Sequence, residues 1–233
     1  MTGGLEQLFL ATLAFVGGHF LLSSSPLRET LILRLGDNPF RGVYSLVVGL
    51  AFVWMLFAYG ATPQVMVWHP PAGLRLVPMV LMPIASFFVV SGLSTRSPTA
   101  VGGEKLIDDL PRPVKGILTI TRHPFQWGIV LWAISHLTVN GDSASIVLFG
   151  GLLLLSLVGM MHIDQRRAAQ LGADWGPFAM CTSLVPFRAV LQGRVSVDWA
   201  GIGWLRLLGG IVLFVLLLLG HGWFAGIPLI SLA

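Results

Sequence analysis

Long apolar segments constrain this chain more than any other feature. Crossing the hydrocarbon core of a bilayer as an α-helix takes about 17–25 predominantly apolar residues. Six segments come close to this requirement, at about 4–22, 42–60, 74–94, 125–140, 143–162 and 204–222. A turn sequence, Asn140-Gly141-Asp142-Ser143, joins the fourth segment to the fifth. We therefore predict an all-α integral membrane bundle of about six transmembrane helices.

The composition agrees with a membrane protein. Charged residues make up 10% of the 233 residues and hydrophobic residues 55%, whereas soluble domains carry about 25% charged residues. This length suits a single transmembrane domain over residues 1–233. One cysteine, Cys181, cannot form a disulfide or a thiolate metal cage within one chain. The basic residues are too scattered for a nucleic-acid surface, so no nucleic acid is expected as a partner.

The positions of Lys and Arg predict the orientation in the membrane. All fourteen basic residues except Arg75 fall between the first and second segments, between the third and fourth, or between the fifth and sixth and at the start of the sixth. Because cytoplasmic loops carry the basic excess, we predict six crossings with both the N- and C-termini on the non-cytoplasmic side. The last connection contains Trp175, Phe178 and Phe187, which we expect to lie in the headgroup layer.

The six histidines fall on two levels of the predicted bundle. His19, His123 and His162 lie near the cytoplasmic ends of their helices. The other three lie towards the opposite side: His69, His136 and His221. Ionisable side chains within a membrane are candidates for function, because leaving them in lipid is costly.

Two imidazoles at one depth on different helices predict an axial pair of ligands for haem iron. His19 and His123 are the proposed metal ligands. Gly17-Gly18, directly before His19, would leave space for a flat macrocycle, and arginines at the interface would pair with its propionates. The side chains expected to bind the cofactor are therefore His19, His123, Arg122, His162 and Arg166.

Each of these residues also has an ordinary structural interpretation. A histidine near a helix end commonly forms an interfacial hydrogen bond. His162 could pair with Asp164, and His136 could bond to Asn140 or a neighbouring carbonyl. Arg122 and the Arg166-Arg167 pair could act as positive-inside anchors alone.

The same residues lie in sequence blocks that resemble a known family. The blocks are FVGGHF at 15–20, DNPFRGVYSLVVG at 37–49, TITRHPFQWGIVLWAISHLTVNGD at 119–142, and MHIDQRRAAQLGADW with SLVPF between 161 and 187. They resemble, in order and over about residues 10–195, the NnrU proteins of denitrifying and related bacteria. The plant and cyanobacterial relative of that family is 15-cis-zeta-carotene isomerase.

This resemblance implies functions that the residues alone do not. The carotene isomerase branch implies a membrane enzyme with haem b, whose two axial histidines match His19 and His123 and whose reduced iron permits a cis-to-trans change in a polyene. The NnrU branch implies a link to nitric-oxide or nitrite metabolism in the bacterial inner (cytoplasmic) membrane. The expected partners are the lipid bilayer and a hydrophobic small molecule or nitric oxide, with a membrane partner protein or a homo-oligomer left open.

Two alternatives remain at this point. The RHP motif and the later Gly-Trp and Val-Pro-Phe segments also resemble isoprenylcysteine and phospholipid methyltransferases, which bind S-adenosylmethionine partly through an acidic pair. Here that pair is missing, and Asp164 is the single carboxylate near its position. The second alternative is a non-enzymatic accessory subunit of a respiratory complex.

Overall fold

The computed structural model describes residues 4–100, 103–107 and 114–229, and this part of the chain is helical and has no named strand. This confirms the predicted all-α class. The α-helices are α1 (Leu5–Ser23), α2 (Ser25–Leu35), α3 (Asp37–Ala61), α4 (Leu76–Leu93), α5 (Pro124–Val139), α6 (Ser143–Leu171), α7 (Trp175–Cys181), α8 (Arg188–Leu191), α9 (Trp199–Ile202) and α10 (Trp204–Ala225). The short 3-10 helices are η1 (Ala72–Arg75), η2 (Gly103–Leu106), η3 (Gly116–Thr119) and η4 (Gly172–Asp174).

Within the described residues, five helical stretches are long and apolar enough to cross a membrane. They are Leu5–Ser23, Asp37–Ala61, Ala72–Leu93, Ser143–Cys181 and Trp204–Ala225, and each contains or largely overlaps one of the predicted segments. The remaining predicted segment, 125–140, forms α5, which has 16 residues. At 1.5 Å per residue α5 is about 24 Å long, which is shorter than a hydrocarbon core of about 30 Å.

The chain divides into two compact units. The first comprises Met1–Val77 and Ala133–Gly159, and the second comprises Pro78–Trp132 and Met160–Ala233. Helices α5 and α6 therefore each contribute residues to both units. The single domain expected over 1–233 stays a prediction.

In the first unit, α1 and α3 pack together and also contact the first half of α6. The ring centroids of Phe15 and Phe52 lie 5.2 Å apart. The hydroxyl oxygens of Tyr59 and Ser145 are 3.0 Å apart. Gly151 lies against Thr12 so closely that an added Cβ would collide with the threonine side chain. Small residues allow membrane helices to approach in this way.

The connection between α5 and α6 is also fixed within the first unit. The backbone N–H groups of Val67 and Trp68 both donate to the carbonyl of Gly141, at 2.8 and 3.1 Å. Ser143 N–H donates to the carbonyl of Val65 at 2.9 Å. A Cβ on Gly141 would collide with the carbonyl oxygen of Trp68, so this close approach requires glycine.

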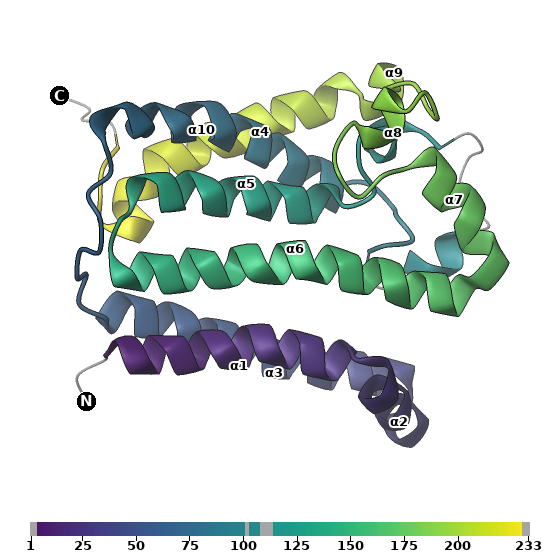
Figure 1. Ribbon diagram of the computed structural model, residues 1–233, viewed down its shortest axis with the longest axis horizontal. Coiled ribbons are helices and arrows are strands. Elements are labelled where there is room, and N and C mark those ends of the chain that lie inside the picture. The colour runs from purple at the N-terminus through teal and green to yellow at the C-terminus, as the bar shows by residue number, and fades with distance from the viewer. Residues whose placement is uncertain (1–3, 101–102, 108–113, 230–233) are drawn as a thin grey trace. The chain divides into compact units, whose positions relative to one another are not determined.

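In the second unit, α4 packs against α5 and α10, and the three helices lie side by side (Figure 1). A Cβ on Gly92 of α4 would meet the backbone of Phe125 at 2.5 Å, and one on Gly128 of α5 would meet the side chain of Val89 at 2.6 Å. A Cβ on Gly210 of α10 would lie 2.7 Å from the Cα of Phe87. Glycines thus set the spacing of these helices.

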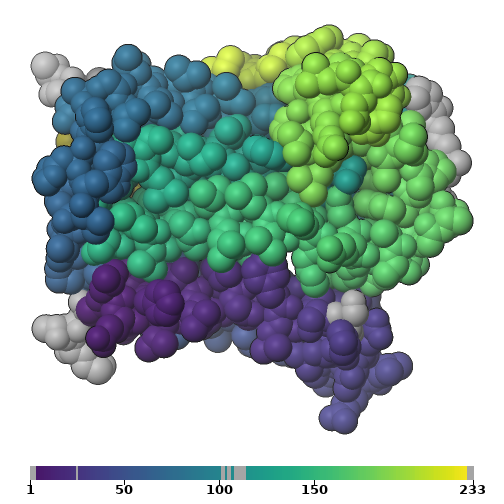
Figure 2. Space-filling model, in the orientation of Figure 1, coloured from purple at the N-terminus to yellow at the C-terminus, as the bar shows by residue number. Residues whose placement is uncertain are grey.

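The connections of the second unit form a folded region with its own apolar core. In the space-filling view, the atoms of α7, α8 and α9 form a continuous surface beside the C-terminal end of α6 (Figure 2). Trp175 and Phe178 are buried in a cluster with Ile117, Ile120 and Ile202. We expected these two aromatic residues in the headgroup layer; the protein core covers them instead, and only Phe187 is exposed, at 40%.

Candidate functional site

His123 directly precedes α5, at a position that the backbone fixes firmly. Pro124 is the first residue of the helix, where its fixed φ is suitable and its missing N–H costs no hydrogen bond. The carbonyl of His123 accepts the N–H of Trp127 at 3.1 Å, and its own N–H donates to the hydroxyl of Thr121 at 3.3 Å. His123 therefore occupies the N-terminal cap of α5.

The segment before His123 is bound to the SLVPF segment at 183–187. Arg122 N–H donates to the Ser183 carbonyl at 3.0 Å, and the Thr121 hydroxyl donates to the Leu184 carbonyl at 2.9 Å. Phe187 N–H donates to the Ile120 carbonyl at 2.9 Å. Two sequence blocks that are about 60 residues apart thus form one support for the imidazole.

The His123 side chain is fully buried and contacts Asp164 of α6. Its Nε2 lies 2.7 Å from Asp164 Oδ1, and the two side chains are 0% and 14% exposed. Its Nδ1 is buried and has no hydrogen-bond partner among the described residues. Burial penalises the imidazolium and lowers the pKa of His123, although the hydrogen bond to Asp164 acts in the opposite direction. A neutral ring that donates Nε2–H to the carboxylate leaves the lone pair on Nδ1.

Arg122 contacts the same carboxylate. Its Nε lies 2.8 Å from Asp164 Oδ2, and its Nη2 donates to the same oxygen. The guanidinium also lies over the ring of Trp175, 5.7 Å from the ring centroid. Because the positive charge of Arg122 balances Asp164, His123 can remain neutral beside a carboxylate.

Sequence reasoning did not identify Asp164 as the partner of Arg122 and His123. The sequence did contain a signal for this pairing. A carboxylate near the end of an apolar helix needs a cation or a hydrogen-bond donor at the same depth in the membrane. Asp164 follows His162 by two residues, and we considered it only as a partner of His162 or of a methyltransferase ligand. Residues two apart on a helix do not share a face, so α6 presents Asp164 and His162 in different directions.

The other predicted cofactor contacts on α6 also lie away from this cluster. His162 and Arg166 are four residues apart and share a face of α6 that differs from the face of Asp164. Arg167 is buried and donates to the carbonyl of Ala100 at 3.0 Å. Nearby, the Thr99 hydroxyl donates to the Arg122 carbonyl at 2.7 Å. The connection after α4 thus adds further hydrogen bonds around Arg122.

His19 lies on α1 in the first unit. Its Nδ1 is 2.9 Å from the carbonyl oxygen of Phe15, and because a carbonyl can only accept, Nδ1 carries the hydrogen and Nε2 carries the lone pair. The ring also makes edge contacts with Phe15 and Tyr44, at 4.7 and 5.9 Å between centroids. His123 belongs to the second unit, so the ligand pair stays a prediction.

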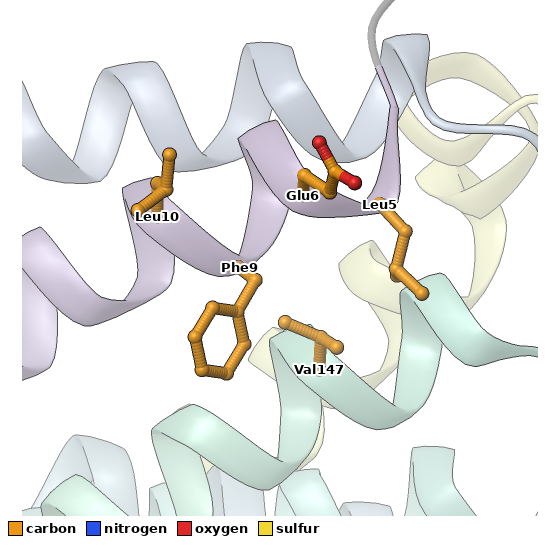
Figure 3. A pocket seen from close by; sticks show the side chains of 5 residues that line it. All are labelled: Leu5, Glu6, Phe9, Leu10 and Val147. Carbon is orange, nitrogen blue, oxygen red and sulfur yellow. The ribbon is translucent and has the colours of Figure 1, made fainter.

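An open pocket lies at the other end of α1. It is lined by Leu5, Glu6, Phe9, Leu10 and Val147 (Figure 3). Phe9 and His19 are ten residues apart, which is about 15 Å along the helix. The pocket therefore does not include the candidate ligand of α1.

Within the described residues, no three His, Cys, Asp or Glu side chains gather as they would around a zinc ion. His136 and Phe149, both in the first unit, stack with 4.7 Å between their ring centroids. The Asn140 side chain donates to the His136 carbonyl at 3.0 Å. The ring stacking agrees with a structural interpretation of His136, whereas the Asn140 hydrogen bond involves only its main chain.

Comparison with known proteins gives the family. The sequence matches the family described as NnrU protein over residues 7–229, which is nearly the whole chain. It is also 34% identical over 79 residues to the chloroplastic 15-cis-zeta-carotene isomerases of Arabidopsis thaliana and Zea mays. That match covers 34% of this chain and 22% of each relative. No solved structure matches the chain. With five helices in its described part that can cross a bilayer, the chain is a multi-pass membrane protein that belongs to the NnrU family.

Proposed function

We propose that this protein binds haem b through His19 and His123 in a bacterial inner membrane and isomerises a double bond of a hydrophobic polyene. The observation that carries the proposal is the environment of the His123 ring. A buried carboxylate accepts its Nε2–H at 2.7 Å, and its buried Nδ1 has no partner among the described residues. An apolar protein interior is a costly place for such a nitrogen unless something binds it.

The two histidines fit an iron site in their hydrogen bonding. A histidine that binds a metal almost always donates its other ring N–H to a carboxylate or a backbone carbonyl. His123 has Asp164 in this role, and His19 has the carbonyl of Phe15. When bound, a reduced haem iron would lower the barrier to rotation about one double bond of the polyene.

The residues around His123 agree with a reaction that exchanges no atoms. A cis–trans isomerisation needs no general acid and no leaving-group proton. His123 is kept neutral by burial, and the charge of Asp164 is balanced by Arg122. Arg166, a predicted contact of a haem propionate, lies near the end of α6, where a cation can also reach the interface.

The relatives support the choice of reaction. Their name, 15-cis-zeta-carotene isomerase, describes an isomerase of an apolar polyene, and 34% of this chain aligns with 22% of each of them. A hydrophobic polyene is therefore the proposed substrate class. A role in nitric-oxide or redox metabolism shares the same haem site and becomes an outcome of the test.

The methyltransferase alternative loses support at Asp164. That reaction would need a carboxylate to bind the amine of S-adenosylmethionine. The carboxylate of Asp164 already accepts hydrogen bonds from both Arg122 and His123, and only 14% of its side chain is exposed. A further cation would have to displace one of these partners.

The test is the absorption spectrum of the purified full-length protein in detergent, before and after reduction. We expect a Soret band in the wild type and its loss in His19→Ala and in His123→Ala. His69→Ala is the matched control, because His69 is exposed and lies outside the site. A colourless wild-type protein, even when expressed with added haem, would overturn the proposal.

The proposed reaction is tested with the same preparation. The reduced wild type should convert a polyene with a central cis double bond into the all-trans form, with no change in mass. His19→Ala and His123→Ala should not carry out this conversion. Tight binding of nitric oxide by reduced protein that does not isomerise any cis polyene would replace isomerisation with the nitric-oxide role while keeping the haem.

A further inference from the structure

Asp164 contacts His123 from α6 in an arrangement that determines which ring nitrogen is available. Its Oδ1 lies 2.7 Å from Nε2 of His123, and the imidazole is fully buried. A carboxylate accepts hydrogen bonds and a neutral imidazole has one N–H. The contact therefore selects the tautomer with hydrogen on Nε2 and directs the lone pair of Nδ1 away from Asp164.

The carboxylate itself is held in place by Arg122. The guanidinium donates through Nε at 2.8 Å and through Nη2 to Asp164 Oδ2, and two donors from one planar group fix the orientation of a carboxylate. The main chain of Arg122 is fixed in turn, because its N–H donates to the Ser183 carbonyl and its carbonyl accepts from the Thr99 hydroxyl. The acceptor of the imidazole N–H is thus rigid.

The main chain at His123 is equally constrained. His123 caps α5, and the neighbouring Thr121 donates to the carbonyls of Ser183 and Leu184. Rotation of the ring would break the contact with Asp164 and leave a buried carboxylate short of one donor, which is costly. The ring is therefore held in a single orientation.

We infer that Asp164 is a positioning residue: its carboxylate holds the Nε2–H of His123, so that Nδ1 is the nitrogen that binds the haem iron. The inference rests on the proposed function and adds an assignment of the ligating atom. Hydrogen bonding of a ligating histidine to a carboxylate also raises its basicity. Asp164 should thereby stabilise ferric over ferrous iron and lower the midpoint potential.

The first test reads the tautomer directly. Full-length protein labelled with ¹⁵N-histidine is studied in detergent by long-range ¹H–¹⁵N correlation, with and without haem. We expect His123 to carry its hydrogen on Nε2 in the wild type, and to lose this single tautomer in Asp164→Asn. A hydrogen on Nδ1 of His123 in the wild type would overturn the inference.

The second test measures the affinity for haem and the midpoint potential of the bound haem. Loss of the hydrogen-bond partner of a ligating histidine typically lowers metal affinity about 10–100-fold. Asp164→Asn should therefore bind haem more weakly and show a higher midpoint potential. Asp174→Asn, which removes an exposed carboxylate beyond the end of α6, should leave both values unchanged. An unchanged potential in Asp164→Asn that retains haem would contradict the inference.

A double variant separates the positioning of His123 by Asp164 from an effect of Asp164 on folding. Asp164→Asn alone leaves the Arg122 charge without its carboxylate, whereas Arg122→Gln with Asp164→Asn removes both charges and leaves two neutral groups. The double variant should fold and show the same rise in potential as the single variant. A wild type without haem would overturn the proposed function, while a Nε2–H tautomer in that protein would still support positioning of the ring by Asp164.

Discussion

Three side chains from two segments, Arg122, His123 and Asp164, form a buried polar cluster in the second unit. Arg122 and Asp164 are 13% and 14% exposed, and His123 is not exposed at all. Charges in such a place are tolerated when they are paired and hydrogen-bonded. Removing one charged partner alone is therefore costly, because it leaves the other charge buried and unbalanced.

Replacing Arg122 with glutamine tests this dependence. The change leaves Asp164 without its balancing charge, and removing one partner of a buried ion pair costs about 3 kcal/mol or more. We expect Arg122→Gln to lower the free energy of unfolding by about that amount, measured by denaturant titration in detergent micelles.

The matched control is Arg96→Gln, because Arg96 is exposed and surface substitutions usually change stability by within about 0.5 kcal/mol. An equal decrease in the free energy of unfolding in both variants would mean that the Arg122–Asp164 pair contributes nothing specific to stability.

The sequence allowed part of this cluster to be predicted. The position of Arg122 and His123 at a helix start followed from Pro124 and from the apolar run after it. The partner could not be derived from spacing, because it depends on the rotation of α6, and Asp164 and His162 differ by two residues on that helix. Hydropathy determines the depth of a residue but not the direction in which its side chain points.

At the scale of helices, glycines in α4, α5 and α10 determine how closely the second unit packs. Gly210 is the clearest example, because an added Cβ would meet both the Cα and the N of Phe87 in α4, at 2.7 and 3.0 Å. Backbone atoms cannot move aside as a flexible side chain can. The two helices would have to separate to accept any side chain there.

We therefore expect Gly210→Ala to destabilise the protein by about 1–3 kcal/mol, as overpacking typically does. Gly49→Ala in α3 should be neutral or slightly stabilising, since a Cβ there meets nothing within 4 Å and alanine favours helix. Thermal unfolding of both variants in the same detergent makes the comparison. A neutral Gly210→Ala would show that α10 and α4 are not in such close contact.

The last connection also shows where hydropathy predicts the wrong environment for a side chain. The apolar residues of the last connection predicted a segment in contact with lipid, but Trp175 and Phe178 are buried against Ile117 and Ile202. Aromatic residues are common both in protein cores and at membrane interfaces. The sequence alone therefore does not distinguish the two environments.

At the scale of the whole molecule, the length of α5 decides the topology. Six crossings place both termini on the same side, whereas five place them on opposite sides. The 16 residues of α5 could cross only a thin or locally thinned bilayer. The basic residues nevertheless favour six crossings, because all except Arg75 then lie on one side.

Fusions to the two termini test this prediction in a bacterial inner membrane. Alkaline phosphatase, which is active only outside the cytoplasm, should be active at both the N- and C-terminus. A reporter at the connection between α6 and α10 should behave as cytoplasmic. Activity at one terminus alone would mean an odd number of crossings and would move α5 out of the set of transmembrane helices.

The central claim, that His19 and His123 share one iron, is tested most directly by electron paramagnetic resonance of the ferric protein. We predict a low-spin signal from two imidazole ligands in the wild type, and conversion to high-spin haem or loss of haem in His19→Ala and in His123→Ala. The low-spin signal of two imidazoles persisting unchanged in either variant would contradict the claim.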